Sequence, residues 1–301
     1  MSSLSAASAL VKAGVNARLS RILTTGRERA ADLGDAGDEL FDAAAALLAG
    51  GKRTRALLAG LGAALARHAA TRGHHLHLVA RRADALAQTA AACDGAASIT
   101  LHPLDLTDAD AVAAWLPSLP PIDILINNAG SGIFQTACDT TDAETAAMLR
   151  LNTLAPIQLI HALAPLMVAR GHGHIINIIS QAGKIATPKT AAYAASKHAL
   201  LGYSNALRLE LAGSGVLVTS VNPGPMQTAF FDHADPDGHY QKALGTFWLT
   251  DPEALAASIC AAFHRPVREI NRPRLMEAAA RLYPLAPRLG DWLTRRFFSR
   301  K

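Results

Sequence analysis

The sequence has few cysteines, few aromatic residues and no long uninterrupted apolar run. Its three cysteines, Cys93, Cys138 and Cys260, stand far apart with no CxxC pair. This argues against a disulfide framework or a cysteine-ligated zinc site and fits a reducing compartment. No run of 18 apolar residues occurs, so the sequence predicts no membrane-spanning helix. Half of the 301 residues are hydrophobic, which is enough to offset chain entropy and predicts one or two folded domains.

The positive charge is concentrated at the C-terminal end. The net charge is +5, but residues 264–301 hold ten Lys or Arg and three Asp or Glu, a local +7, which leaves −2 on the rest. A nucleic-acid-binding protein normally shows a broad basic face with interleaved aromatic residues. We therefore expect no nucleic-acid partner, and any function of a basic surface belongs to the C-terminal segment.

Residues 1–50 differ in composition from the rest. They are rich in Ala and Ser, and their first acidic residue, Glu28, follows four basic ones. Such a composition is typical of a mitochondrial transit peptide. It also fits an ordinary extension with weak helices or an upstream start codon, which we favour. No secretory signal is present, and the expected location is cytoplasmic.

From about residue 56 the pattern alternates between strands and helices. The predicted strands are His75–Ala80, Ser98–Leu104, Ile122–Asn127, His174–Ile179 and Val216–Val221. The predicted helices are Gly62–Thr71, Ala83–Ala91, Asp108–Leu116, Asp142–Val168 and Ala191–Ala212. This order predicts an α/β fold with a doubly wound parallel sheet, which binds ligands at the carboxyl ends of its strands. We divide the chain into an extension (1–50), one α/β domain (51–265) and a basic amphipathic helical tail (266–301).

Short motifs stand at the ends of the later strands. The NNAG motif at 127–130 ends the third predicted strand, Ser180 ends the fourth, and the NPG motif at 222–224 ends the fifth. A YAASK motif, Tyr193 to Lys197, opens the long helix 13 residues after Ser180. One YxxxK alone is common by chance, but the ordered set is specific. Over residues 56–265 these motifs resemble the classical short-chain dehydrogenase/reductase family, which implies a Rossmann-like fold.

The residue types also make chemical sense by themselves. Tyr193 and Lys197 are four apart on a helix, so both project from one face. A nearby ammonium lowers the pKa of a tyrosine from about 10, so Tyr193 can protonate a carbonyl oxygen that receives a hydride, or act in reverse on an alcohol. Ser180 can hydrogen-bond the same oxygen. The resemblance further implies that Lys197 holds the nicotinamide ribose and that Asn152 supports a proton-relaying water. Taken singly, each of these four residues is more often structural.

Two arginines predict the choice of nicotinamide cofactor. Arg81 and Arg82 follow the strand that ends at Ala80, with no acidic residue beside them. An arginine there accommodates the 2′-phosphate of NADP, whereas an acid would bind the ribose of NAD. NADPH is therefore favoured over NAD, although solvated charges at a helix start would look the same.

Further cofactor contacts follow from the resemblance. Asp105 and Leu106 match the position that contacts adenine, although Asp105 could equally be a turn residue. The remaining candidates, besides Tyr193 and Lys197, are Gly60, Leu61, Gly62, Asn128, Ala129, Gly130, Pro223, Gly224, Met226 and Thr228.

The phosphate loop departs from the family pattern TGxxxGxG. Gly60 to Gly62 match its end, but Arg55 and Ala56 occupy the Thr-Gly places, and residues 51–55 make a poor buried strand. Three explanations stay open. Residues 52–58 are forced into the strand, or the strand comes from 21–26 with a large insertion, or the segment before Gly60 is scrambled relative to an ancestral gene.

Two segments bear on partners. Residues 228–249 contain five aromatic residues: Phe230, Phe231, Tyr240, Phe247 and Trp248. In the family that these motifs resemble, this region is a mobile lid over the substrate. The aromatic residues indicate an apolar carbonyl or alcohol substrate, or they simply pack in the core. In the tail, Leu289, Trp292, Leu293 and Phe297 recur at helical spacing among arginines.

Such a basic helix can lie on a membrane or pack on its own domain or a twofold partner, and we expect a homo-oligomer. The leading hypothesis is an NADPH-dependent carbonyl reductase. The alternative is a non-catalytic protein of this fold, with a damaged nucleotide loop, that acts through protein or membrane contacts.

Overall fold

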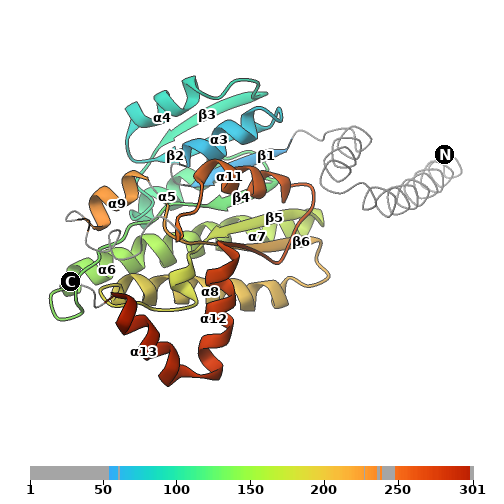
Figure 1. The fold of residues 1–301 in the computed structure, drawn as a ribbon. Coiled ribbons are helices and arrows are strands. Elements are labelled where there is room, and N and C mark those ends of the chain that lie inside the picture. Colours follow the sequence, from blue (N-terminus) through green and yellow to red (C-terminus); the bar gives the residue numbers. More distant parts are fainter. Residues whose placement is uncertain (1–53, 60–61, 227, 236–237, 239–247, 299–301) are drawn as a thin grey trace, which may run out of the picture. The chain divides into compact units, whose positions relative to one another are not determined.

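The alternating pattern folds into a single parallel sheet between two helical layers (Figure 1). The computed structural model describes residues 54–59, 62–226, 228–235, 238 and 248–298. Its strands are β1 (Arg55–Ala59), β2 (His75–Ala80), β3 (Ser98–Pro103), β4 (Ile124–Asn127), β5 (Gly173–Ile178), β6 (Val216–Pro223) and β7 (Glu269–Arg272). They lie in the order β3-β2-β1-β4-β5-β6-β7, which confirms the doubly wound, Rossmann-like prediction. The order reverses between β1 and β4, where such a sheet opens a ligand crevice.

The helices cover both faces of the sheet. They are α3 (Ala63–Ala70), α4 (Ala83–Ala91), α5 (Ala109–Trp115), α6 (Asp142–Leu149), α7 (Ala155–Arg170), α8 (Ala191–Glu210), α9 (Ala229–Ala234), α11 (Pro252–Ala261), α12 (Arg274–Leu282) and α13 (Pro287–Phe298). Residues of α3, α4 and α11 share one buried cluster with Ala56 and Leu58 of β1. Residues of α5, α7 and α8 share the other with Leu57. Successive strand side chains point to opposite faces, so one short apolar run serves both cores.

The first strand corrects the expected position of the phosphate loop. Arg55 and Ala56, expected at the Thr-Gly places of the loop, begin β1 instead, and β1 pairs with both β2 and β4. Ala56, Leu57 and Leu58 are almost fully buried, as a central strand requires. Arg55 remains exposed at the strand's start, where its N–H donates to Asp123 Oδ2 at 2.8 Å.

This arrangement agrees with the first of the three explanations, with the strand at 55–59 rather than 52–58. Only residues 60–62 then separate β1 from α3. The alternative strand at 21–26, like the extension 1–50, lies outside the described residues.

The predicted helix Asp142–Val168 is three consecutive pieces. Between α6 and α7 the backbone makes one π-helical turn, Arg150–Leu154. By length and composition alone, Asp142–Arg170 is the one segment in the described part of the chain that could cross a bilayer, and half of its most apolar window is buried. Residues Leu159, Ile160, Leu163 and Met167 of α7 belong to the core. The segment is therefore accounted for as a core helix.

The sheet continues beyond residue 265, where the sequence predicted the tail to begin. β7 pairs in parallel with β6, and α12 packs against β7. A short turn, Tyr283–Leu285, joins α12 to α13. The basic C-terminal segment thus supplies the last strand of the sheet before it forms two helices.

Candidate active site

The π-helical turn places Asn152 in the interior. Asn152 is fully buried, and its Nδ2 donates to the Ser131 carbonyl at 2.8 Å and to Ser196 Oγ at 2.9 Å. Its Oδ1 accepts from the Ser131 N–H at 2.9 Å. A π-helical turn often marks a functional position. Here it aims the amide at α8 and at the loop after β4.

Tyr193 and Lys197 lie one turn apart on α8, as predicted. Both are buried, and Lys197 Nζ lies 5.9 Å from the centroid of the Tyr193 ring. Lys197 Nζ donates to the Ile178 carbonyl at 3.1 Å. Burial lowers the pKa of Lys197 to about 8, from the ordinary 10.5. The ammonium thus still carries its proton at neutral pH, but holds it less tightly than an exposed lysine does.

The side chains of Lys197 and Asn152 both lie close to Gly130. A Cβ atom at Gly130 would lie 3.3 Å from Asn152 Oδ1 and 3.4 Å from Lys197 Nζ. Gly130 belongs to the NNAG motif at the carboxyl end of β4, so two of the predicted motifs converge there. The glycine leaves room beside the lysine that a side chain would fill.

Ser180 follows β5 and begins the short turn Gln181–Gly183. Its Oγ accepts from the Ala182 N–H at 3.0 Å and lies 3.5 Å from the Pro223 carbonyl oxygen, to which it donates. This turn packs on α8, since a Cβ at Gly183 would lie 2.9 Å from the Lys197 carbonyl oxygen. Ser180 is therefore fixed between the NPG motif and the helix that carries Tyr193 and Lys197.

The start of α3 faces the NNAG motif. A Cβ at Gly62 would lie 3.3 Å from Asn128 Nδ2, while Ala129 packs against the core. Among the described residues no side chain caps α3, and the first turn of this helix carries no acidic residue. Free backbone N–H groups there suit an anion such as a pyrophosphate. Together with the room at Gly130, this makes the described residues compatible with a dinucleotide; Gly60 and Leu61 lie outside the described residues.

The four residues predicted for the adenosine end lie after β2 and β3. Arg81 and Arg82 are exposed, and Arg81 Nη1 is 4.0 Å from Asp105 Oδ2. Asp105 Oδ1 accepts from the N–H and the hydroxyl of Thr107, at 2.8 and 2.7 Å, so Asp105 does shape a turn. Leu106 is buried. Both arginines are accessible to a phosphate group.

The NPG motif is held by the C-terminal segment. Gly224 N–H donates to the Arg272 carbonyl at 2.6 Å, and a Cβ at Gly224 would lie 2.8 Å from Pro273 Cδ. Pro223 ends β6, Met226 packs against the core, and Thr228 precedes α9. Gly224 of the NPG motif is therefore positioned by its contacts with the end of β7 and the start of α12.

Aromatic rings surround the Tyr193 ring. Phe134 lies edge-on to it with centroids 5.4 Å apart, and Phe230 of α9 lies 5.8 Å away. Phe231 contacts both phenylalanines, at 5.6 and 5.5 Å. We call Phe134, Phe230 and Phe231 the phenylalanine cluster. Of the other predicted lid aromatics, Tyr240 and Phe247 lie outside the described residues.

Comparison with known proteins agrees with this geometry. A family model described as short chain dehydrogenase matches residues 55–238. The chain belongs to the short-chain dehydrogenase/reductase family. Dehydrogenase/reductase SDR family protein 7-like from Anopheles gambiae is 32% identical over 247 residues, which cover 78% of this chain and 75% of that protein. Several further curated relatives are matched over only 55–59% of their own length.

Solved structures of short-chain dehydrogenases share the fold. The enzyme from Streptomyces avermitilis superposes with a TM-score of 0.67 at 27% identity, covering 80% of this chain and 96% of that one. The short-chain dehydrogenase from Sphingobium yanoikuyae, in complex with NADPH, gives a TM-score of 0.67 at 29% identity, covering 80% and 95%.

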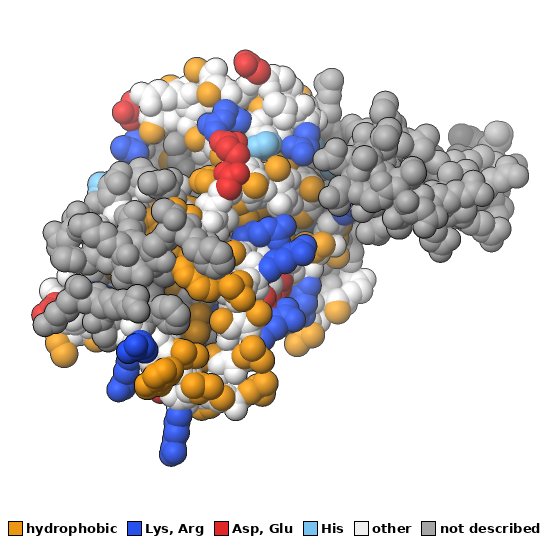
Figure 2. All heavy atoms as spheres, in the orientation of Figure 1, with side chains coloured by type: hydrophobic (Ala, Val, Ile, Leu, Met, Phe, Trp, Pro, Cys, Tyr) orange, Lys and Arg blue, Asp and Glu red, His pale blue; other side chains and the backbone are white. Residues whose placement is uncertain are grey.

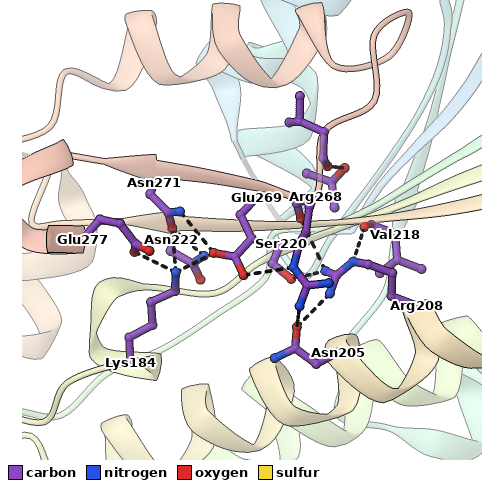
Figure 3. A network of polar contacts seen from close by, with 12 residues as sticks. Lys184, Asn205, Arg208, Val218, Ser220, Asn222, Arg268, Glu269, Asn271 and Glu277 are labelled. Atoms are coloured by element: carbon purple, nitrogen blue, oxygen red, sulfur yellow. Dashed lines mark hydrogen bonds and ion pairs between the residues drawn. The ribbon is translucent and has the colours of Figure 1, made fainter. Parts of the chain in front are cut away.

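This short-chain dehydrogenase/reductase also has a half-buried ionic cluster that the sequence did not reveal (Figure 3). Lys184, four residues after Ser180, donates to Glu269 at 2.5 Å, Glu277 at 2.7 Å and Asn271 at 3.0 Å. Burial alone would raise the pKa of Glu269, but the hydrogen bonds from Lys184 and Asn271 hold it below its ordinary value. The cluster ties the Ser180 turn to β7 and α12.

Two other site residues carried no recognisable signal. Ser196 links the site, because its hydroxyl accepts from Asn152 and donates to the Tyr193 carbonyl at 2.7 Å. Phe134 stands in a loop without periodicity. The position of Ser196 inside the YAASK motif was the only hint available, since its bond to Asn152 and the contact of Phe134 with Tyr193 join distant parts of the chain.

Proposed function

We propose that the protein is an NADPH-dependent oxidoreductase that reduces the carbonyl group of an apolar small molecule, or oxidises the corresponding alcohol in reverse. Membership of the family supports oxidoreductase chemistry. The single observation that carries the proposal is the buried Lys197 beside Tyr193, with its ammonium and the Asn152 amide both next to Gly130.

Each residue has a chemical task in this proposal. Bound NADPH would supply the hydride. Tyr193 would donate its phenolic proton to the developing alkoxide, and the Lys197 ammonium would stabilise the phenolate that remains. Ser180 would hydrogen-bond the same oxygen and fix its direction. Asn152 would hold the loop after β4 against Lys197 through its bonds to Ser131.

Three groups of residues would hold the cofactor. The uncapped start of α3 suits the pyrophosphate. Lys197 and the NNAG motif would take the nicotinamide ribose. The preference for NADPH is supported by the exposed guanidinium groups of Arg81 and Arg82 after β2, and a similar protein, from Sphingobium yanoikuyae, is known in complex with NADPH.

The phenylalanine cluster supports an apolar substrate. Two of its rings, Phe134 and Phe230, lie next to the proton-donating Tyr193, and Phe231 packs against both. A substrate carbonyl that reaches Tyr193 would therefore contact aromatic carbon rather than charged groups. Rings of this kind favour flat or apolar molecules through burial and edge-to-face contacts.

The decisive experiment is a fluorescence titration of the purified chain with NADPH and, separately, with NADH, followed by a screen of carbonyl compounds. We expect saturable binding that favours NADPH. Arg82→Ala should weaken NADPH binding while leaving NADH binding nearly unchanged, and Arg72→Ala, an exposed arginine outside the site, is the matched control.

Tyr193→Phe supplies the test of the chemistry. It should still bind NADPH but should not turn over. Binding of neither cofactor by the folded chain would overturn the proposal and favour the non-catalytic alternative. Undiminished turnover by Tyr193→Phe would refute the assigned proton donor.

A further inference from the structure

The two C-terminal helices carry an unusual share of the exposed apolar side chains. We define the C-terminal hairpin as residues 274–296, the described side chains of α12, the connecting turn and α13. Twelve large hydrophobic residues are exposed in the described part of the chain, and six of them belong to the hairpin: Leu275, Leu282, Leu285, Leu289, Trp292 and Leu293. Figure 2 shows apolar and basic side chains together over the region where α12 and α13 lie. Clustered exposure of this kind marks a binding surface.

Each helix of the hairpin carries exposed apolar and basic side chains together. On α12, the Arg-Leu pairs at 274–275 and 281–282 are seven residues apart, so Leu275 and Leu282 lie on the same face. On α13, which begins after the turn at 283–285, Leu289, Trp292 and Leu293 are three or four residues apart and share one face. Apolar residues on one face among exposed arginines are typical of an interfacial amphipathic helix.

The hairpin's acidic residues pair with only one of its five arginines, Arg281. Glu277 is buried and binds Lys184, and its other oxygen accepts from Arg281 at 2.7 Å. Asp291 accepts from the Tyr283 hydroxyl. Four other arginines, which form no ion pair with a described residue, stay exposed: Arg274, Arg288, Arg295 and Arg296. The exposed surface is thus both apolar and positive.

The hairpin is also held firmly to the body of the protein. Glu277 reaches Lys184 beside the Ser180 turn, and Met276 lies against Gly224. At the turn, Tyr283 packs against Gly290 and bonds Asp291. These contacts fix α12 to the domain through its buried side. The exposed leucines and Trp292 are therefore left on the outer side of the hairpin.

We propose that the C-terminal hairpin binds the surface of an anionic lipid bilayer. Its leucines and Trp292 would enter the boundary between headgroups and acyl chains, and its arginines would contact lipid phosphates. The positive charge of the hairpin favours an anionic bilayer over a second copy of the chain as the binding partner. A twofold interface places the same patch on both sides, so the unpaired arginines of one copy would face those of the other.

Vesicle flotation of the full chain tests the proposal. The probes are vesicles of phosphatidylcholine alone and of phosphatidylcholine with about 30% phosphatidylserine, at low and high salt. We expect binding to the anionic vesicles only, with loss at high salt. Trp292 emission should shift to shorter wavelength on binding, and the shift should vanish in Trp292→Phe.

Matched variants at two exposed leucines test whether the hairpin is the surface that binds the vesicles. Leu282→Glu should weaken binding by about tenfold or more, and Leu209→Glu, an equally exposed leucine at the end of α8, should not. Because both side chains are exposed, both variants should fold, which thermal unfolding verifies.

Three results would overturn the proposal. The first is no binding to anionic vesicles by the folded chain, and the second is equal binding by Leu282→Glu and the parent. The third is a doubled mass in light scattering that Leu282→Glu abolishes, which would assign the surface to a second copy.

Discussion

Replacing Lys197 by methionine should abolish turnover and make the folded protein more stable at neutral pH. Burial lowers the pKa of Lys197 from 10.5 to about 8. Each pKa unit corresponds to about 1.4 kcal/mol, so keeping the buried ammonium charged costs about 3 kcal/mol. Methionine cannot form the hydrogen bond from Lys197 to the Ile178 carbonyl, and losing this bond destabilises the variant by about 1 kcal/mol. The net gain of about 2 kcal/mol should raise the melting temperature by roughly 3 °C at this chain length.

The dependence on pH identifies the cause. Between pH 8 and 10.5 the unfolded chain holds a proton on Lys197 that the folded chain has lost, so the stability of the parent rises with pH in that window. Below pH 8 the full penalty applies, and above pH 10.5 both states carry a neutral amine and the penalty disappears. The advantage of Lys197→Met should therefore be largest at pH 7 and shrink steadily toward pH 10.

Lys184→Met is the matched control, with the same substitution at a half-buried lysine that has carboxylate partners. Lys184 is paired with Glu269 and Glu277, and its removal leaves two carboxylates without their counter-charge. Breaking such a pair costs about 3–5 kcal/mol when fully buried, and somewhat less here because the side chains retain 11–18% exposure. Lys184→Met should thus lower the melting temperature at pH 7.

The assay is thermal unfolding of the three proteins, without cofactor, between pH 6.5 and 10. The reasoning on Lys197 is refuted if Lys197→Met is no more stable than the parent at pH 7. It is also refuted if the advantage persists unchanged at pH 10, because a packing effect would not depend on the lysine's proton.

Three further predictions follow from single contacts. Asn152→Ala should lower stability by about 1–3 kcal/mol, measured by urea unfolding, because it strips the buried Ser131 backbone of its partners. Tyr193→Phe removes only a hydroxyl, and calorimetry should find NADPH affinity within a few-fold of the parent while turnover is lost. Gly215→Ala should destabilise far more than Gly213→Ala: both have positive φ, but only at 215 would the Cβ overlap the carbonyl oxygen of Gly171. Equal losses for the two alanines would show that backbone strain, about 1 kcal/mol, is the only effect.

The strands were predictable because their signals are local. The bounds of His75–Ala80 were predicted correctly, and the other predicted strands differ by one or two residues at their ends. Apolar runs of this length suit a parallel sheet buried on both faces. The spacing of Ser180, Tyr193 and Lys197 is likewise local, so the YxxxK pair and its serine could be named in advance.

The first strand shows where local signals stop. Counting back from Gly60 and Gly62 placed Arg55 and Ala56 in the phosphate loop. In the structure both residues belong to β1, because the central strand between β2 and β4 is built from the apolar run that they begin. The π-helical turn at Asn152 was equally hidden, since the segment from 142 to 168 has one continuous helical pattern. Its turn is fixed by bonds to Ser131 and Ser196, which are distant in sequence.

By itself, then, the sequence determined the fold class, the order of the strands along the chain and the motif residues at their carboxyl ends, because these depend on neighbours within a few positions. The tertiary structure alone decided which strand stands at the centre, how deeply Lys197 is buried and which partners Lys184 finds. Those properties arise from contacts between segments some 20 to 90 residues apart, and desolvation of a lysine depends on everything packed around it.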